Sequence, residues 1–134
     1  MKKAVLLLLM VTLSFAQGYI EFAKEMGYET KYETALAKAK KEQKNLMILM
    51  VTNYCPWCTK FEKNTLSDTE VDSIVKSKYI PLILNKKKRN LPQYLNTPIV
   101  PTTFFVDPIE EKEYYKQVGY SNEIDFLDLL KELK

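Results

Sequence analysis

Residues 46–51 form an unbroken run of six apolar side chains, and this run restricts the architectures open to the chain more than any other stretch. A run of this length is typical of a β-strand whose two faces are both covered. Residues 32–43, just before it, are rich in Ala, Lys and Glu, which are good helix formers, and Ala35, Leu36 and Ala39 make an apolar stripe. The pattern predicts a layered α/β domain.

The elements that follow also alternate. We expect a helix over 55–64 with Pro56 at its first position, and a second helix that begins near Asp68 and buries Val71, Ile74 and Val75. The further expected elements are a strand over 79–84, a weak helical stretch over 90–96 that begins near Pro92, and strands over 102–106 and 113–118.

A last helix is expected after Ser121 or Asn122, either of which can cap it. Its predicted apolar face consists of Ile124, Phe126, Leu127, Leu130 and Leu133. A βαβ half followed by a ββα half, with the extra helix over 32–43 in front, predicts one central mixed sheet flanked by helices.

The N-terminus has the composition of a secretory signal peptide. Lys2 and Lys3 precede an apolar run, and Ser14 and Ala16 place small residues before a cleavage point. Residues 4–16 number 13, whereas a helix needs about 20 residues to cross a bilayer. We expect cleavage after Ala16, which leaves one domain over 17–134 outside the cytoplasm; an uncleaved anchor or a buried helix is the alternative.

Composition excludes several classes of function. The 134-residue chain has no histidine, two cysteines and three glycines, so we expect no His-based nucleophile, no four-cysteine metal site and no phosphate-binding loop. The leader holds two of the 20 basic residues and none of the 17 acidic ones, so the mature charge is only +1 and does not indicate nucleic-acid binding. The run Lys86-Lys87-Lys88-Arg89 is either an acidic-partner or membrane-surface patch or a solvated loop.

The chemistry of the chain is concentrated in Cys55-Pro56-Trp57-Cys58. A two-residue spacer at a helix start places Cys58 one turn after Cys55. Free N–H groups and the helix dipole at Cys55 favour an anion and lower a thiol pKa from about 8.5 into the range of about 3.5–7.5. We therefore expect Cys55 to be the nucleophile and Cys58 the shielded, resolving thiol.

Two other interpretations of the cysteine pair remain. A purely structural disulfide would close a four-residue ring worth about 2 kcal/mol, against about 4.7 kcal/mol for a 100-residue loop. Capture of Cu(I) by the two thiolates is the other, with Met47 and Met50 close in sequence, although methionine in a strand more often fills the core.

From about residue 32 to residue 134 the chain resembles the thioredoxin-like superfamily, and most of all the secreted bacterial members and the C-terminal domain of the transmembrane thiol:disulfide interchange protein. The resemblance is carried by the helix over 35–41, the strand over 46–51, Cys55-Pro56-Trp57-Cys58, Phe61-Glu62, Thr65-Leu66-Ser67-Asp68, Val71, Val100-Pro101-Thr102 and Gly119. It implies a thioredoxin fold in which Pro101 lies beside the active site and follows a cis peptide bond.

The chain departs from that family in two ways. Its spacer is Pro56-Trp57 rather than the common Gly-Pro of thioredoxins, and looks more like that of glutaredoxins. Leu49 stands six residues before Cys55, where cytoplasmic thioredoxins carry a buried acid. Glu62, four residues after Cys58 and on the same helix face, is the candidate proton acceptor, or else an ordinary solvated carboxylate.

The resemblance also implies that Trp57 and Val100 flank Cys55 and offer apolar contact and backbone hydrogen bonds to an extended peptide. The alternative is that Trp57 is partly packed scaffold.

Together these features predict a monomeric periplasmic or secreted thiol:disulfide oxidoreductase that reduces protein disulfides, without a metal or cofactor, and is served by a membrane-bound redox partner. A disulfide oxidase or isomerase is the alternative enzyme, and a metal- or protein-binding module is the alternative outside catalysis.

Overall fold

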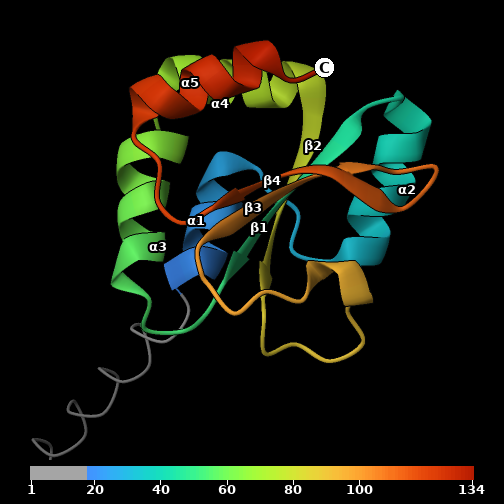
Figure 1. Cartoon of the computed structure of the whole chain (residues 1–134), viewed down its shortest axis with the longest axis horizontal. Helices are drawn as coiled ribbons and strands as arrows, with labels where there is room; N and C mark the ends of the chain where they lie inside the picture. Colours follow the sequence, from blue (N-terminus) through green and yellow to red (C-terminus); the bar gives the residue numbers. More distant parts are fainter. Residues whose placement is uncertain (1–17) are drawn as a thin grey trace, which may run out of the picture.

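The computed structural model describes residues 18–134, and within them the chain forms a four-stranded sheet in the order β2-β1-β3-β4 (Figure 1). β1 (Asn45–Val51) pairs in parallel with β2 (Tyr79–Asn85) and antiparallel with β3 (Thr102–Asp107). β4 (Lys112–Val118) pairs antiparallel with β3. The mixed sheet and its βαβ–ββα order confirm the predicted fold. The predicted signal peptide, residues 1–16, lies outside the described residues.

Helices cover both faces of the sheet. One face carries α1 (Gly18–Met26), α3 (Pro56–Phe61), α4 (Thr69–Lys78) and α5 (Glu123–Glu132), and we call it the cysteine face because Cys58 is buried in its core. The other, the α2 face, carries α2 (Tyr32–Glu42) and the short 3-10 helix η2 (Gln93–Leu95). Figure 1 shows α2 on the side of the sheet away from α3 and α5.

The alternation of side chains along β1 supplies both cores. Met47, Leu49 and Val51 pack on the cysteine face, whereas Leu46, Ile48 and Met50 pack on the α2 face. Every one of these six side chains is at most 1% exposed, which is the double coverage predicted from the apolar run.

Capping side chains begin α4 and α5: Asn122 is one of the two predicted caps, whereas Asp68, expected in the first turn of its helix, is the N-cap residue itself. The Asp68 carboxylate accepts hydrogen bonds from the backbone N–H groups of Glu70 and Val71, and the Asn122 side chain accepts one from Asp125. The predicted stripes on α2 and α4 are buried, except that Ile74 is only partly so.

Two details of the helices correct the expectations. The segment expected as one helix over 55–64 is α3 followed by a π-helical turn, η1 (Glu62–Leu66). On α5 the expected burial of Ile124 is wrong, since its side chain is 67% exposed. Phe126 and Leu130, four residues apart, form the buried ridge, and a residue two places before Phe126 lies about 200° around the helix.

Helix α1 was not predicted. It buries Phe22 and Ala23 against the cysteine face, with Tyr19 and Met26 packed partly against the same core. These residues have the i, i+3, i+4, i+7 spacing of an amphipathic helix, so the signal was present in the sequence. No helix among residues 18–134 has the length and apolar character needed to cross a bilayer.

Candidate active site

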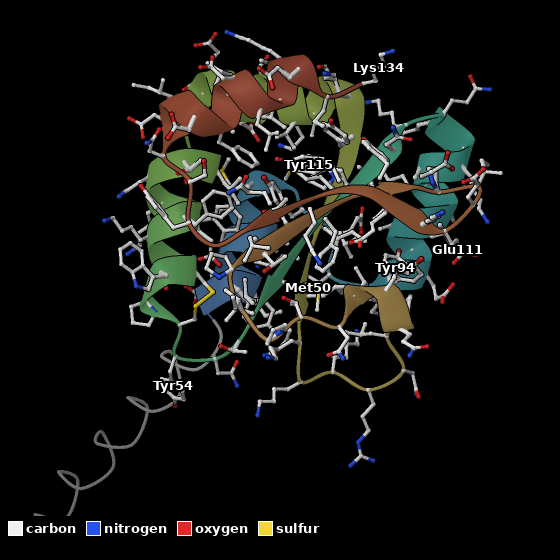
Figure 2. The ribbon with its side chains drawn as sticks, viewed as in Figure 1. Met50, Tyr54, Tyr94, Glu111, Tyr115 and Lys134 are labelled. Atoms are coloured by element: carbon white, nitrogen blue, oxygen red, sulfur yellow. A yellow bond between two sulfur atoms is a disulfide. The ribbon has the colours of Figure 1, made fainter. Side chains whose placement is uncertain are left out.

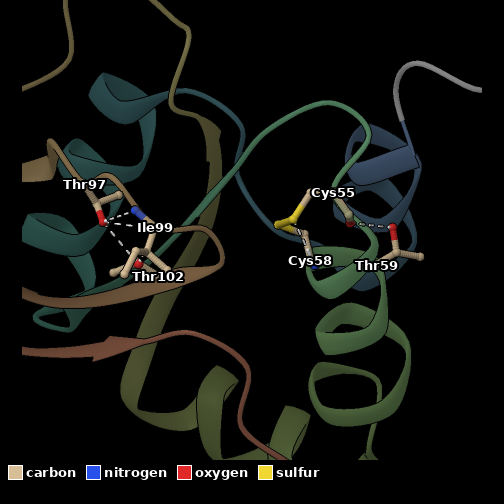
Figure 3. The surroundings of a disulfide bond; sticks show 6 residues. All are labelled: Cys55, Cys58, Thr59, Thr97, Ile99 and Thr102. Carbon is tan, nitrogen blue, oxygen red and sulfur yellow. Dashed lines mark hydrogen bonds between the residues drawn. A yellow bond between two sulfur atoms is a disulfide. The ribbon is translucent and has the colours of Figure 1, made fainter.

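Cys55 and Cys58 form a disulfide at the start of α3, with their Cα atoms 5.2 Å apart (Figure 3). Cys55 is the N-cap residue, Pro56 follows within the first turn, and the Cys55 Sγ accepts a hydrogen bond from the Cys58 N–H at 3.1 Å. The Cys55 side of the pair is partly exposed, whereas Cys58 is only 3% exposed. One sulfur can therefore meet a partner protein while the other is shielded by the core.

The loop before β3 lies near this disulfide, and its shape is held by threonine hydroxyls (Figure 3). The hydroxyl groups of Thr97 and Thr102 donate to the Ile99 carbonyl oxygen at 3.0 and 2.6 Å, and the Ile99 N–H donates back to Thr97 at 3.3 Å. The Val100–Pro101 peptide bond that follows is cis, as the resemblance implied.

Val100 has peptide groups that are not used within the described chain. Its side chain packs partly against the core that contains Cys58, and among residues 18–134 no hydrogen bond occupies its N–H or C=O. Pro101 is buried, and its carbonyl oxygen accepts from the Gly119 N–H at 2.8 Å, which ties the loop to the end of β4.

Trp57 is exposed to solvent, and its ring contacts a second aromatic ring and a lysine side chain. Its side chain is 56% exposed, its ring lies 5.5 Å from the ring of Tyr120, and the Lys60 ammonium sits 4.8 Å from its centroid. The same ammonium is 5.1 Å from the Tyr120 ring, so two aromatic rings share one cation.

Two exposed apolar residues near the disulfide were missed by sequence reasoning. Tyr54, just before Cys55, is 82% exposed and extends away from the domain (Figure 2). Its φ of 55° lies in the left-handed region, which is unusual for a bulky residue and is often found at functional sites. Ile99 is 50% exposed. In the sequence, Tyr54 could have been found from its position next to Cys55, and Ile99 from its position next to Val100-Pro101.

Glu62 is buried, so its interpretation as a solvated carboxylate is wrong. It is 5% exposed and begins the π-helical turn, four residues after the buried Cys58. Burial raises the pKa of its carboxyl group to about 7, with a small opposing contribution from Lys63. A carboxyl group with this pKa exchanges its proton readily near neutral pH.

The cysteine face buries further polar side chains besides Glu62. Leu49 is fully buried, and its neighbour across the β1–β3 pair is Thr103, whose buried hydroxyl has no hydrogen-bond partner within residues 18–134. Tyr28 lies in the same core as Cys58, and its phenol pKa is raised by burial and then by the negative charges of Asp72 and Glu62. Glu62 and Asp72 are therefore two acids close enough to act on this core, and of the two Glu62 is the one with a buried side chain.

The part of the chain that the structure describes contains no group of three or more Cys, Asp or Glu side chains placed to hold a metal ion. Met47 and Met50 pack on opposite faces of the sheet, so they cannot both join the cysteine pair.

A family profile described as thioredoxin-like matches residues 28–108, which include the cysteine pair, Glu62 and Pro101. The chain belongs to the thioredoxin-like family. This confirms the resemblance, and it accounts for the arrangement of the disulfide, the cis peptide bond and the mixed sheet on one scaffold.

Solved structures agree with this fold. A thioredoxin from Thermus thermophilus is 22% identical, with 78% of this chain and 85% of that chain covered and a TM-score of 0.69. The oxidised DsbD C-terminal domain of Neisseria meningitidis is 16% identical, with 80% and 99% covered and a TM-score of 0.63. A disulphide isomerase from Xylella fastidiosa Temecula1 is 17% identical, with 94% and 98% covered and a TM-score of 0.62. Among curated proteins the sequence has no significant match.

Proposed function

We propose that this thioredoxin-like protein is a periplasmic thiol:disulfide oxidoreductase that reduces protein disulfides. The observation that carries the proposal is the asymmetry of the disulfide: Cys55 is accessible at the helix start, whereas Cys58 is buried one turn from the buried carboxyl group of Glu62. A purely structural disulfide does not require one accessible and one buried sulfur, but a two-step thiol–disulfide exchange does.

In the first step the Cys55 thiolate of the reduced protein attacks one sulfur of a substrate disulfide. A Cys55–substrate disulfide forms, and the other substrate sulfur leaves as a thiolate. The N–H of Cys58, which donates to the Cys55 sulfur at 3.1 Å, stabilises the negative charge on Cys55 before the attack.

In the second step the Cys58 thiol loses its proton to ionised Glu62, and its thiolate attacks the Cys55 sulfur. The Cys55–Cys58 disulfide forms, and the second substrate sulfur is released as a thiolate. Two electrons have then passed from the protein to the substrate. A membrane-bound redox partner of the thiol:disulfide interchange class would return them to the cysteine pair.

Substrate recognition uses the surface around the disulfide. The exposed ring of Trp57 supplies apolar contact, and the unoccupied peptide groups of Val100 can pair with an extended substrate strand. Pro101 holds that strand-binding segment beside the disulfide without offering an N–H group of its own.

Reduction is favoured over oxidation because the sequence resembles the C-terminal domain of the transmembrane thiol:disulfide interchange protein, which is a reducing domain. The direction is tested by the equilibrium of the cysteine pair with glutathione. We expect a potential near the thioredoxin value of about −270 mV, whereas a value near −120 mV would make the protein an oxidase. The Xylella fastidiosa structure is described as a disulphide isomerase, so an isomerase is the second candidate, and it would rearrange scrambled disulfides without net reduction.

Export is tested independently of the chemistry. If residues 1–16 are removed as a signal peptide, the intact mass of protein released from the periplasm corresponds to a chain that begins at Gln17. Full-length protein that stays in the membrane pellet after a salt wash would show that the segment is retained as an anchor.

A further inference from the structure

The basic loop, residues 86–89, lies at the same edge of the sheet as the cysteine pair. It follows β2, and Cys55 follows β1; because these strands are parallel, both segments leave the sheet at its carboxyl-terminal edge. Two hydrogen bonds tie the segments together: the Lys86 N–H donates to the Val51 carbonyl oxygen at 2.8 Å, and the Asn85 side chain donates to that of Asn53 at 3.0 Å. Figure 1 shows the two connections side by side at this end of the domain.

The charges of the loop are not neutralised by neighbouring acids. Lys87, Lys88 and Arg89 are exposed, and no ion pair among residues 18–134 includes them. Lys87 and Lys88 border a surface hollow of about 440 Å³, to which Lys31 adds a third ammonium group. The other residues that line it are Tyr19, Ile20, Thr30, Ile83 and Asn85, so among residues 18–134 no carboxylate lines the hollow.

We propose that the basic loop, together with Lys31, is a docking surface for acidic segments of the proteins whose disulfides react at Cys55. This inference rests on the proposed function and specifies the partner of the same site. The mature chain carries a net charge of only +1, so attraction of an acidic partner depends on this local cluster rather than on the protein as a whole.

The loop fits a polypeptide better than a lipid surface. Membrane-surface segments combine basic side chains with exposed apolar ones that enter the headgroup region. Residues 86–90 contain no apolar side chain, and Leu91, the next one, is packed against the core of the α2 face. A bilayer bound at this edge would also cover the partly exposed Cys55, whereas a chain bound across it would bring its own disulfide to that sulfur.

The experiment compares three peptide disulfides that share one cyclic core and differ only in flanking residues: Glu, Gln or Lys. The test variant is Lys87→Glu/Lys88→Glu. The matched control is Lys40→Glu/Lys41→Glu, which reverses two exposed charges in the last turn of α2, where the chain turns back toward the start of β1. Both keep the catalytic residues and change the net charge equally, and kcat/KM is measured at low and at 0.15 M salt.

For the Glu-flanked peptide at low salt we expect kcat/KM to fall at least about tenfold in the test variant and less than about twofold in the control. Salt should shrink the difference, because the Debye length falls to about 8 Å at 0.15 M. The Lys-flanked peptide should react faster with the test variant, and the Gln-flanked peptide should not change. Equal effects in the two variants, or an equal loss with the Gln-flanked peptide, would overturn the docking surface.

The outcomes separate docking from chemistry. If the unmodified protein reduces none of the three peptides, the proposed function fails; binding of a cysteine-free Glu-rich peptide, titrated against the same variants, still decides the docking surface. Lys87/Lys88-dependent binding of phosphatidylglycerol vesicles with unchanged peptide kinetics would contradict the proposal and assign the loop to a lipid surface.

Discussion

The two faces of the sheet differ in how far their buried polar groups have hydrogen-bond partners. On the α2 face the buried hydroxyl groups are paired: Tyr32 with Tyr94 at 3.0 Å, and Thr102 with the Ile99 carbonyl oxygen at 2.6 Å. On the cysteine face the buried hydroxyl groups of Tyr28 and Thr103 have no hydrogen-bond partner within residues 18–134, and Glu62 has a raised pKa. The α2 face pairs these hydroxyl groups, whereas the face whose core contains Cys58 keeps polar groups that are costly to bury.

The largest expected effect comes from one phenylalanine on each face. Phe61 and Phe104 are both fully buried, and Phe61 packs edge-on against Phe126 at 5.2 Å. Replacing either with alanine should lower the free energy of unfolding by about 3–5 kcal/mol, measured in urea. Only Phe61→Ala should also change the alkylation rate of reduced Cys58, because Phe61 shares its core. Equal changes in that rate would mean that the faces are not chemically distinct.

A smaller effect is expected at Glu62. Since its folded pKa of about 7 lies above the ordinary value of 4.5, the folded state binds more protons than the unfolded state between these values. Stability should therefore fall as pH rises from about 4.5 to about 7, by up to about 3 kcal/mol, and Glu62→Gln should abolish this fall. Denaturant titrations at pH 5 and pH 8 measure it.

The same variant tests the proposed proton transfer. In Glu62→Gln the resolving step should lose its rise with pH near 7, because no base then accepts the Cys58 proton. A pH profile identical to that of the unmodified protein would assign this step to water or to another group.

The smallest effects have opposite signs at adjacent residues. Thr103→Val removes an unpaired buried hydroxyl group and should stabilise the fold by about 1 kcal/mol. Thr102→Val removes a donor to the Ile99 carbonyl oxygen and should destabilise it by about 1 kcal/mol. Thermal unfolding of the two variants gives the comparison, and a loss of stability in both would show that Thr103 has a partner after all.

Sequence patterns predicted what depends on local periodicity. Three predicted features depend on neighbours in the chain and are found in the structure: the apolar run of β1, the cap at Asn122 and the cysteine spacing. The start of α4 near Asp68 is a fourth. The resemblance, rather than periodicity, indicated the cis bond before Pro101. Helix α1 was predictable from the spacing of its apolar residues.

The features that could not be predicted depend on how segments distant in the sequence pack over one another. The helical period placed Glu62 on the face of Cys58, but its burial results from elements remote in sequence that pack over the cysteine face. Ile124 is an error of a different kind, because its position about 200° around α5 from Phe126 already places it away from the buried ridge. The contact between the basic loop and the segment before Cys55 arises from the parallel pairing of β1 with β2.

The central claim, that Cys55 attacks and Cys58 resolves, is tested most directly by mass spectrometry of single-cysteine variants mixed with a disulfide-bonded substrate protein. Cys58→Ala should accumulate a covalent complex through Cys55, because the thiol that resolves it is missing, and Cys55→Ala should accumulate none, because Cys58 is buried. A complex formed by Cys55→Ala but not by Cys58→Ala, or sustained turnover by either variant, would contradict the account.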